Sequence, residues 1–330
     1  MPNSLLSYEL RAEGIAISIT LALAQTIIIA VFIGSIAGFM GGIHYYLELI
    51  SHFHLQYLMI ALICLLFFIA LHAWWSAATT ILIILLNLLV VLPYYIPRIN
   101  VDLKEPYYPM KLLFSNVESK NINFSGFISY VIEENPDVLI IQEATESWIN
   151  RLQAIEKRFP YNKALPRPWS VGIALYSRLP VAQFEVITLG SERLPGLIAR
   201  INHGGRMFSV VTMHPRQPLQ RHYFRQRNEQ LRDAASIVQG LPAPKILVGD
   251  LNISLWSPYY AQLIRHTGLY NARQGFGLLP TWPTYMPVRI GMIPIDHCLV
   301  SPDIRVLHMR TGWNIGSDHL PIVVDIGIPV

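Results

Sequence analysis

Charge is distributed so unevenly along this chain that one part of it must fold in a different solvent from the rest. Before residue 98, the only Lys, Arg, Asp or Glu residues are Glu9, Arg11, Glu13 and Glu48. All the other charged residues lie from Arg98 onward, although only 14% of the 330 residues are charged overall. An ordinary soluble domain has about 25% charged residues, so the first 97 residues do not resemble one.

Three apolar runs fill this N-terminal part, at about 14–40, 57–71 and 77–92. A helix needs roughly 20 apolar residues to cross a bilayer. The first run exceeds that length, and the other two reach it with flanking residues such as Leu55, Trp74 and Tyr95. The runs predict three transmembrane helices that form a membrane anchor over residues 1–97.

A cleaved signal peptide is the alternative explanation of the first run. Its N-terminal flank contains Glu9, Arg11 and Glu13 in place of a basic cluster, and its apolar core is too long for a signal. Two further apolar runs follow, which cleavage would not explain. The loops between the runs contain no Lys or Arg, so the positive-inside rule leaves the side of the C-terminal part open.

The two cysteines and the overall charge constrain the chain little. Cys64 lies in the second apolar run and Cys298 in an expected buried strand, so a disulfide between them is not expected. Neither has the spacing of a zinc site. The net charge of +4 is compatible with a phosphate-bearing partner, and equally with a membrane protein whose domain lies on the cytoplasmic side.

After a linker at about 98–109, residues 110–330 have the pattern of a soluble α/β domain. Several apolar runs are short and continuous, as in strands covered on both faces, and helical patterns lie among them. The pattern predicts two packed sheets flanked by helices, an α/β sandwich. We expect helices at 122–134, 147–159 and 220–238, and strands at 110–115, 138–142, 172–176, 184–189, 196–201, 207–214, 245–248, 295–300, 304–309 and 322–326.

Polar residues stand at the ends of many of these expected strands. In α/β folds, functional sites are built where strand ends meet at one edge of a sheet. Each residue alone has an ordinary explanation, such as a turn former or a packed core histidine. Together they supply only carboxylates, carboxamides and imidazoles, which makes chance improbable: Asn116, Glu143, His214, Asp250, Asn252, Asp296, Asp318 and His319.

These residue types suit the hydrolysis of a phosphoester. Hard oxygen ligands such as Glu143, Asn116 and a second carboxylate are those that Mg²⁺ prefers. An imidazole paired with a carboxylate, His319 with a partner such as Asp296, can hold a proton or a charge near a phosphate. No Ser or Cys with an activating neighbour stands out and no Gly-rich phosphate loop occurs, so direct attack by water is the simpler chemistry.

In order and spacing, these motifs resemble the endonuclease/exonuclease/phosphatase superfamily. The resemblance covers about residues 110–327 and is closest to bacterial members with membrane helices before the catalytic domain. Its motifs are Phe114-Ser115-Asn116-Val117-Glu118, Ile141-Gln142-Glu143, Val211-Thr212-Met213-His214, Gly249-Asp250-Leu251-Asn252, Ile295-Asp296-His297 and Gly316-Ser317-Asp318-His319-Leu320-Pro321.

The resemblance implies a four-layer α/β sandwich and a set of roles. Asn116, Glu143, Asp318 and Glu118 would hold Mg²⁺, or Mn²⁺ in its place, with Glu143 as the main ligand. Glu118 stands where many relatives have Asp. The catalytic group would be His214 at the phosphate, Asp250 and Asn252 at the attacking water, and Asp296 paired with His319.

Arg216 and Trp282 are the candidate contacts to substrate. The resemblance also implies a multi-pass protein of the bacterial inner membrane, and no feature predicts a protein partner.

Three functions remain open at this point. A nuclease would use the arginines at 216, 221, 225, 227 and 232 and the aromatic residues among them to bind a nucleic acid strand, although a solvated helix face has the same composition. A phosphodiesterase or phosphatase acting on lipid head groups or other small membrane-proximal phosphoesters suits the short linker, which spans only about 55–60 Å when extended. A binding module without catalysis would have lost residues such as Glu143, Asp250 or His319, and all are present.

Overall fold

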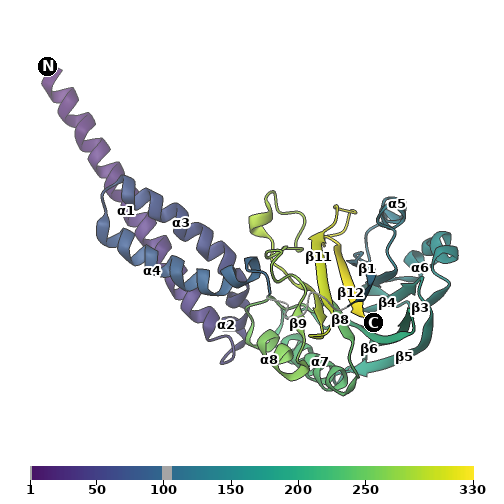
Figure 1. The fold of residues 1–330 in the computed structure, drawn as a ribbon. Helices are drawn as coiled ribbons and strands as arrows, with labels where there is room; N and C mark the ends of the chain where they lie inside the picture. The colour runs from purple at the N-terminus through teal and green to yellow at the C-terminus, as the bar shows by residue number, and fades with distance from the viewer. Residues whose placement is uncertain (1, 99–105) are drawn as a thin grey trace. The chain divides into compact units, whose positions relative to one another are not determined.

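The computed structural model describes residues 2–98 and 106–330, with side chains from residue 12 onward. The chain separates into two compact units, Met1–Leu92 and Pro93–Val330 (Figure 1). Most of the expected linker, residues 99–105, lies outside the described part. Each unit is described by itself below.

The first unit consists of helices, as its apolar runs predict. These are α1 (Pro2–Phe39), α2 (Tyr45–Ile50), the short 3₁₀ turn η1 (Ser51–Phe53), α3 (His54–Ala70) and α4 (Trp74–Val91). Three stretches are long and apolar enough to cross a membrane: Ala12–Phe39, Tyr45–Ala70 and Trp74–Tyr95. The prediction of three long apolar helices before the soluble domain is confirmed.

Small residues let α1 approach α3 closely. A Cβ atom on Gly34 would lie 2.9 Å from the Tyr57 ring, and one on Gly38 would lie 3.0 Å from Nε2 of His54. Such small residues one turn apart are typical of helices that pack closely within membranes. A polar chain joins the same helices: Asn87 of α4 donates through Nδ2 to Ser35 Oγ (2.9 Å), and its Oδ1 lies 2.8 Å from His54 Nδ1.

The second unit contains two six-stranded mixed sheets. The first has the order β11-β12-β1-β2-β4-β3. Its strands are β1 (Tyr107–Asn116), β2 (Val138–Gln142), β3 (Tyr161–Leu165), β4 (Ile173–Ser177), β11 (Arg305–Thr311) and β12 (Ile322–Pro329). β1 and β2 are parallel, whereas β12 and β4 run antiparallel to them.

The second sheet has the order β5-β6-β7-β8-β10-β9. Its strands are β5 (Val181–Leu189), β6 (Leu194–His203), β7 (Arg206–Met213), β8 (Lys245–Asp250), β9 (Tyr270–Asn271) and β10 (Asp296–Val300). β7 and β8 are parallel, and β10 runs antiparallel to β8.

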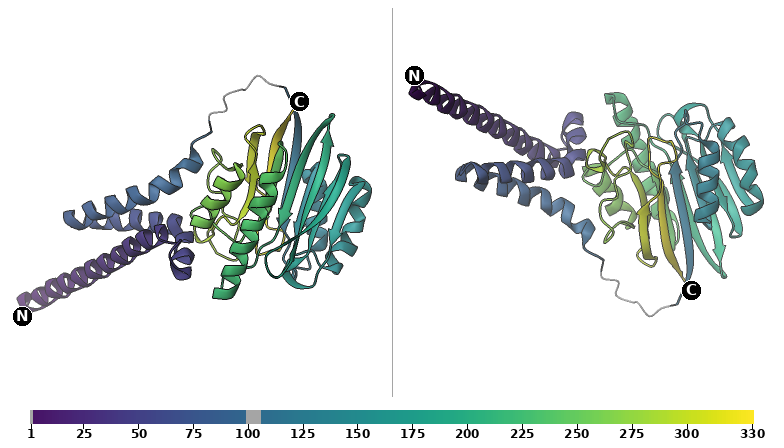
Figure 2. Two further views of the ribbon diagram at one scale, coloured as in Figure 1. Left: turned by 90° about the horizontal axis from the view of Figure 1, so that it is seen from below. Right: turned by 90° about the horizontal axis from the view of Figure 1, so that it is seen from above.

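Alternation along the strands divides the apolar residues between two layers of core. On β1, Leu112 and Phe114 face the core between the sheets, whereas Leu113 faces the helices outside. The first sheet is covered by α5 (Phe124–Glu134), α6 (Glu146–Leu152) and the 3₁₀ turn η3 (Gln153–Arg158), and the second by α7 (Arg221–Gly240) and α8 (Pro258–Thr267) (Figure 2). The expected sandwich of two sheets flanked by helices is confirmed.

Two strands and one α-helix of the second unit were not expected from the sequence. β3 is an edge strand whose first residues, Tyr161 to Lys163, are exposed and polar, so it lacks the apolar run of a central strand. β9 has only two residues. α8 begins at Pro258, and Ser257 caps it by accepting a hydrogen bond from the Tyr259 amide, a start signal present in the sequence.

The second unit begins with a segment that packs on the loop after β9. The carbonyl of Tyr94 accepts hydrogen bonds of 2.9 Å from the amides of both Gly275 and Gly277. A Cβ on Gly275 would lie 2.9 Å from Pro97, and both glycines have positive φ, so larger residues would not fit. Pro93 to Arg98 is therefore fastened to this loop.

One buried side chain links the two sheets. Gln142, the last residue of β2, donates through Nε2 to the Met213 carbonyl (2.7 Å) and accepts from the Asp250 amide at Oε1 (2.9 Å). A Cβ on Gly249 would lie 2.6 Å from Gln142 Nε2, so the glycine leaves room for this contact. Gln142 is fully buried, so its amide is satisfied only by the opposite sheet.

We predict that Gln142→Met, which keeps the length of the side chain, destabilises the protein by about 2–4 kcal/mol because two buried backbone groups lose their partners. Chemical denaturation of the full chain measures the change. Gln183→Met on the exposed face of β5 is the matched control and should change stability by less than about 0.5 kcal/mol. Equal stability of the two variants would contradict the linking role.

We predict that Gly34→Leu lowers the thermal stability of the first unit, because overpacking a close helix contact costs about 1–3 kcal/mol. The full chain in detergent is heated and the loss of helicity followed by circular dichroism. Gly14→Leu on the same helix is the control, since nothing lies within 4 Å of a Cβ at that position. If both variants melt like the parent, α1 and α3 do not pack through Gly34.

Candidate active site

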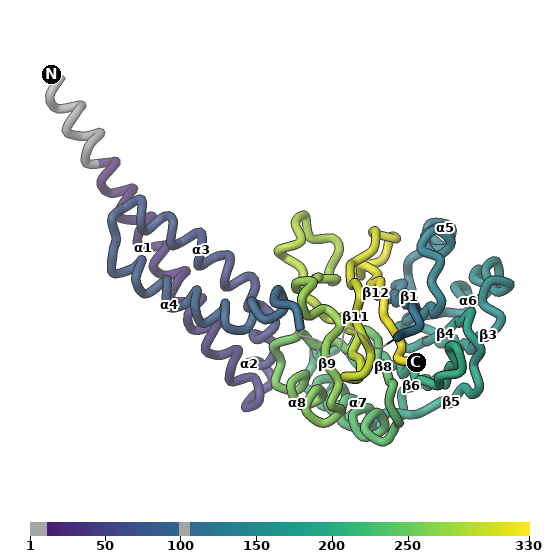
Figure 3. Tube along the Cα trace, in the orientation of Figure 1, coloured from purple at the N-terminus to yellow at the C-terminus, as the bar shows by residue number. Residues whose placement is uncertain are grey.

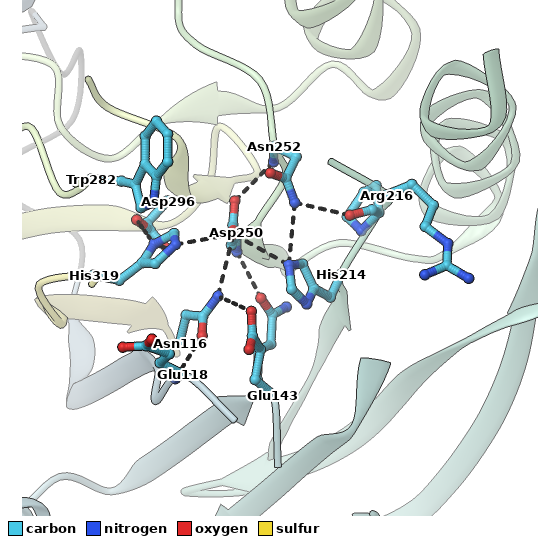
Figure 4. A network of polar contacts seen from close by, with 12 residues as sticks. Asn116, Glu118, Glu143, His214, Arg216, Asp250, Asn252, Trp282, Asp296 and His319 are labelled. Atoms are coloured by element: carbon cyan, nitrogen blue, oxygen red, sulfur yellow. Dashed lines mark hydrogen bonds and ion pairs between the residues drawn. The ribbon is translucent and has the colours of Figure 1, made fainter. Parts of the chain in front are cut away.

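The polar residues expected at strand ends converge where the two sheets meet at one edge (Figure 4). β1 and β2 end together, with Asn116 opposite Gln142 in the parallel register. In the other sheet, Asp250 at the end of β8 lies opposite Asp296 at the start of β10. The remaining members lie in loops at the same edge: Glu143 after β2, His214 after β7 and His319 before β12.

Asp250 lies at the centre of this cluster. Its Oδ2 lies 3.2 Å from His214 Nε2 and 3.6 Å from His319 Nε2, and its Oδ1 accepts the Asn252 amide at 2.8 Å. Burial alone would raise the pKa of this carboxyl group. The charge of His319 and the hydrogen bond from His214 outweigh burial and lower the pKa, so Asp250 is an anion at neutral pH.

His319 lies between two carboxylates. Its Nδ1 is 2.9 Å from Asp296 Oδ2, and its Nε2 faces Asp250. Burial disfavours the charged ring, but the negative charges of Asp296 and Asp250 dominate and raise the pKa of His319 to about 10. His319 is therefore an imidazolium at neutral pH. The pairing of His319 with Asp296 expected from the sequence is present.

His214 and Asn252 form the wall of the cluster on the α7 side. Burial opposes a charge on His214, but the hydrogen bond and charge of Asp250 raise its pKa above the usual value. Asn252 donates through Nδ2 to the Pro215 carbonyl (2.9 Å), so the loop after β8 is attached to the loop after β7. His214 and Asp250 thus stay in contact.

A second group, made of acidic side chains, lies beside Asp250. Asn116 donates to Glu143 Oε1 at 3.2 Å and to Asp250 Oδ2 at 3.4 Å, so it connects the two groups. Glu118 accepts the Asp318 amide at 3.0 Å. Burial and the negative charges of Asp318 and Glu143 raise the pKa of Glu118. The four expected metal ligands, Asn116, Glu118, Glu143 and Asp318, are therefore neighbours.

Strained backbone holds three of these residues in place. Glu118, Glu143 and Asn252 have φ values of 57°, 60° and 50°, in the left-handed region that residues with a Cβ rarely adopt. Glu143 turns there directly after β2, so its carboxylate lies beside Asn116 and accepts the Ser119 amide at 2.9 Å. Such strain concentrates at functional sites, where the surrounding structure maintains it.

The donor set of this edge fits a divalent cation. Glu118, Glu143 and Asp318 repel one another, and Asn116 adds a carboxamide oxygen, which together form an all-oxygen set suited to Mg²⁺. Asp250, Asp296 and His319 also offer ligand atoms within 4.8 Å of one another. In that second set the imidazolium of His319 already supplies the positive charge, so the acidic group is the better cation site.

The two candidate substrate contacts differ in position. Trp282 lies over the site, donating through Nε1 to Asp318 Oδ2 at 3.0 Å. Arg216 points away from Asp250 (Figure 4) and donates to Glu192 at 2.7 Å. Arg216 and His214 line a groove of about 180 Å³ together with Ser170, Leu219 and Tyr223.

Some polar residues near the site have structural contacts only. His297 donates from Nε2 to the Ile253 carbonyl at 2.7 Å, and burial lowers its pKa to about 3, so the ring is neutral. Arg273 is fully buried and donates to the carbonyls of Leu278 and Asp296. Arg227 is also fully buried and donates to the Asn252 carbonyl at 3.1 Å.

Two positioning residues were missed in the sequence. Gln142 holds the Asp250 amide, and Ser317 donates to the Asn116 carbonyl (2.8 Å) while accepting the His319 amide (3.1 Å). Gln142 could have been noticed as a carboxamide at the end of an apolar strand, as Asn116 was. Ser317 has no comparable signal, because a serine in a Gly-Ser-Asp loop is typical of any turn.

Comparisons with known proteins identify the family. The model of the endonuclease/exonuclease/phosphatase family matches residues 113–319. No protein with a curated description matches the sequence.

Solved structures share the fold at low identity. The TDP2 protein of D. rerio, complexed with a single-strand DNA product, is 18% identical, with a TM-score of 0.57 over 66% of this chain and 98% of its own. The human Nocturnin catalytic domain, with a bound sulfate, is 19% identical, with a TM-score of 0.54 over 71% and 99%. Sphingomyelinase C of Streptomyces griseocarneus is 17% identical, with a TM-score of 0.50 over 67% and 99%.

The family match extends from β1 to His319 and so includes each of the strand ends that form the site. The neighbours share the arrangement of two sheets that brings those ends together. This chain belongs to the endonuclease/exonuclease/phosphatase family and is a metal-dependent phosphoester hydrolase.

Proposed function

We propose that the protein is a membrane-anchored, Mg²⁺-dependent hydrolase that acts on a phosphodiester or phosphomonoester near the membrane. It would be a multi-pass protein of the bacterial inner membrane. The observation that carries the proposal is the pair of adjoining groups at the sheet edge, one acidic and one with an imidazolium between carboxylates. A cation site next to a proton-holding site is what phosphoester hydrolysis by water needs.

Asn116, Glu118, Glu143 and Asp318 would hold the ion, and Mn²⁺ could replace Mg²⁺. When bound, the ion polarises the phosphoryl oxygen and stabilises the leaving oxygen. Trp282 keeps Asp318 oriented through its hydrogen bond, and the Ser119 amide does the same for Glu143. The strained turns at Glu118 and Glu143 hold both residues directly after the strands that end at the site.

The other group orients water and neutralises charge. Asp250 is a buried anion whose Oδ1 is held by the Asn252 amide, so its carboxylate can orient a water molecule and accept its proton. The imidazolium of His319 places a positive charge where negative charge grows on the phosphate. His214 contributes a second ring of raised pKa beside the same carboxylate.

Water is the better nucleophile because the side chains near the site are not activated. Ser317 uses its hydroxyl group as a donor to the Asn116 carbonyl. Cys298 is buried in β10, and burial raises the pKa of its thiol to about 12, so it is not a thiolate.

The positions of the arginines after His214 favour membrane-proximal substrates over nucleic acid. Arg227 is buried beneath the site, and Arg216 is paired with Glu192. Arg221, Arg225 and Arg232 remain exposed on α7, a solvated helix face. A basic track leading to Asp250 is therefore not formed by this set, whereas three helices long and apolar enough to cross a membrane would anchor the chain beside phospholipids.

We predict that Glu143→Gln lowers hydrolysis of the model diester bis(p-nitrophenyl) phosphate by at least about 10²-fold, because one charge of the cation site is lost. Mg²⁺ should raise the melting temperature of the parent and not that of the variant, since only a bound ion stabilises the folded state. Glu146→Gln, three residues on and exposed in the first turn of α6, is the control. Parent-like activity and Mg²⁺ response in Glu143→Gln would show that the ion binds elsewhere.

We predict that the full chain with Mg²⁺ releases head groups or phosphate from a panel of phospholipids in mixed micelles. A panel of DNA and RNA oligonucleotides is tested in parallel, with His319→Ala as the inactive reference. Release of nucleotides without action on any lipid would exclude the membrane-proximal substrate and establish the nuclease alternative.

A further inference from the structure

Large apolar side chains are strongly exposed at one edge of the catalytic domain, the edge that holds the site. We call six of them the apolar rim: Ile122 (82% exposed), Trp169 (77%), Tyr285 (71%), Leu219 (68%), Trp313 (61%) and Val288 (59%). They lie in different loops, after β1, before β4, after β7, between β9 and β10, and between β11 and β12.

The strand registers place all these loops on the same edge. The end of β1, at Asn116, lies next to the start of β12, at Ile322. The end of β2, at Gln142, lies next to the start of β4, at Ile173. In Figure 3 the loops at 272–295 and 312–321 rise on the side of the sheets where α5 lies. The loops of the opposite edge, at 135–137, 178–180, 203–206, 241–244 and 301–304, are all described and expose no large apolar side chain.

One member of the rim, Trp169, has a strained backbone. Trp169 has a φ of 65°, a conformation that a residue with a bulky side chain adopts only when its surroundings enforce it. A glycine or asparagine would adopt it more readily. A strained and solvent-facing tryptophan has no role in the core, so it points to a contact outside the domain.

The chemistry of the rim matches a bilayer surface. Trp and Tyr are the residues enriched at the membrane interface. The same loops also expose the basic Lys120, Arg167 and Arg289, which suit anionic head groups. The acidic Glu118 and Asp318 of these loops are only partly exposed and belong to the proposed cation site.

One loop of the rim also contacts the first residues of the second unit. Tyr94, the next-to-last residue of the third apolar span, is hydrogen-bonded to Gly275 and Gly277 at the start of the 272–295 loop, which carries Tyr285 and Val288. These contacts lie within the second unit.

We propose that the apolar rim inserts into the lipid bilayer surface, so that the domain works with its site facing the lipid and takes phospholipid head groups as substrate. This inference rests on the proposed phosphoesterase function and adds the substrate class and the docking surface. A head-group phosphate lies at the depth where a site surrounded by interfacial side chains would meet it.

The test uses nitroxide labels on the full chain, reconstituted in vesicles of phosphatidylcholine and phosphatidylglycerol. Single cysteines replace rim residues (Trp169→Cys, Tyr285→Cys, Trp313→Cys) or exposed residues of the opposite edge (Arg206→Cys, Asp303→Cys). Cys64 and Cys298 are buried, and the unmodified chain gives their background. Collisions with oxygen, which concentrates in lipid, are compared with collisions with a water-soluble nickel chelate.

We expect the rim labels to favour oxygen and the opposite-edge labels to favour nickel. Rim labels as accessible to nickel as the opposite-edge labels would overturn the proposal. Protection of the rim labels by an added oligonucleotide, without contact to lipid, would also overturn it and assign the rim to nucleic acid.

A second measurement separates docking from catalysis. The triple variant Ile122→Ser, Tyr285→Ser, Trp313→Ser should lose about tenfold or more of its phospholipid hydrolysis in vesicles because its apolar anchors are removed. Its hydrolysis of bis(p-nitrophenyl) phosphate should equal that of the parent. Equal rates on vesicles would overturn the docking. Rim labels in lipid, in a protein that hydrolyses no phosphoester, would refute the enzymatic proposal and leave the docking in place.

Discussion

The site depends on one buried carboxamide between the two sheets. Gln142 belongs to the first sheet, yet both ends of its amide bond to the second, at Asp250 and Met213. Each catalytic group is built on one sheet or the other, so their distances depend on how the sheets are joined. A buried amide with hydrogen bonds at both ends allows only one position of the first sheet relative to the second, whereas apolar contacts alone would allow several. The apolar core packs the sheets together, and Gln142 and Asn116 form hydrogen bonds between them at the site.

Charge within the site is balanced in two different ways. Around His319, two carboxylates are compensated by a proton on the ring, because the pKa of the imidazolium is raised to about 10. Around Glu143, the described residues give Glu118 and Asp318 hydrogen bonds from neutral groups, with His319 Nε2 4.0 Å from Asp318 Oδ1, and burial raises the pKa of Glu118. One group contains its own cation, His319, and the other favours a cation from solution. The division between proton chemistry and metal chemistry follows from that difference.

Much of this architecture was predictable because buried strands and helices leave recognisable apolar patterns in the sequence. The sequence predicts that Val138 to Gln142 is a strand covered on both faces, and the structure has a fully buried strand there. The pairing of Asp296 with His319 could be anticipated once both were placed at strand ends. What could not be predicted depends on contacts between segments distant in the sequence: Arg216 pairs with Glu192, and Arg227 of α7 is buried against the loop after β8. β3 was missed because an exposed edge strand needs no apolar run.

The rim extends the same argument beyond the domain. Apolar side chains that face water do not gain the free energy of burial, and several large ones gathered at one edge indicate a surface that something else covers. Six such residues from five loops, remote in sequence, share one edge because the strands on which they depend end there together. That edge also holds Asp250 and His319. The fold therefore brings the reacting groups and the apolar surface to one place, and whatever covers the rim also meets the site.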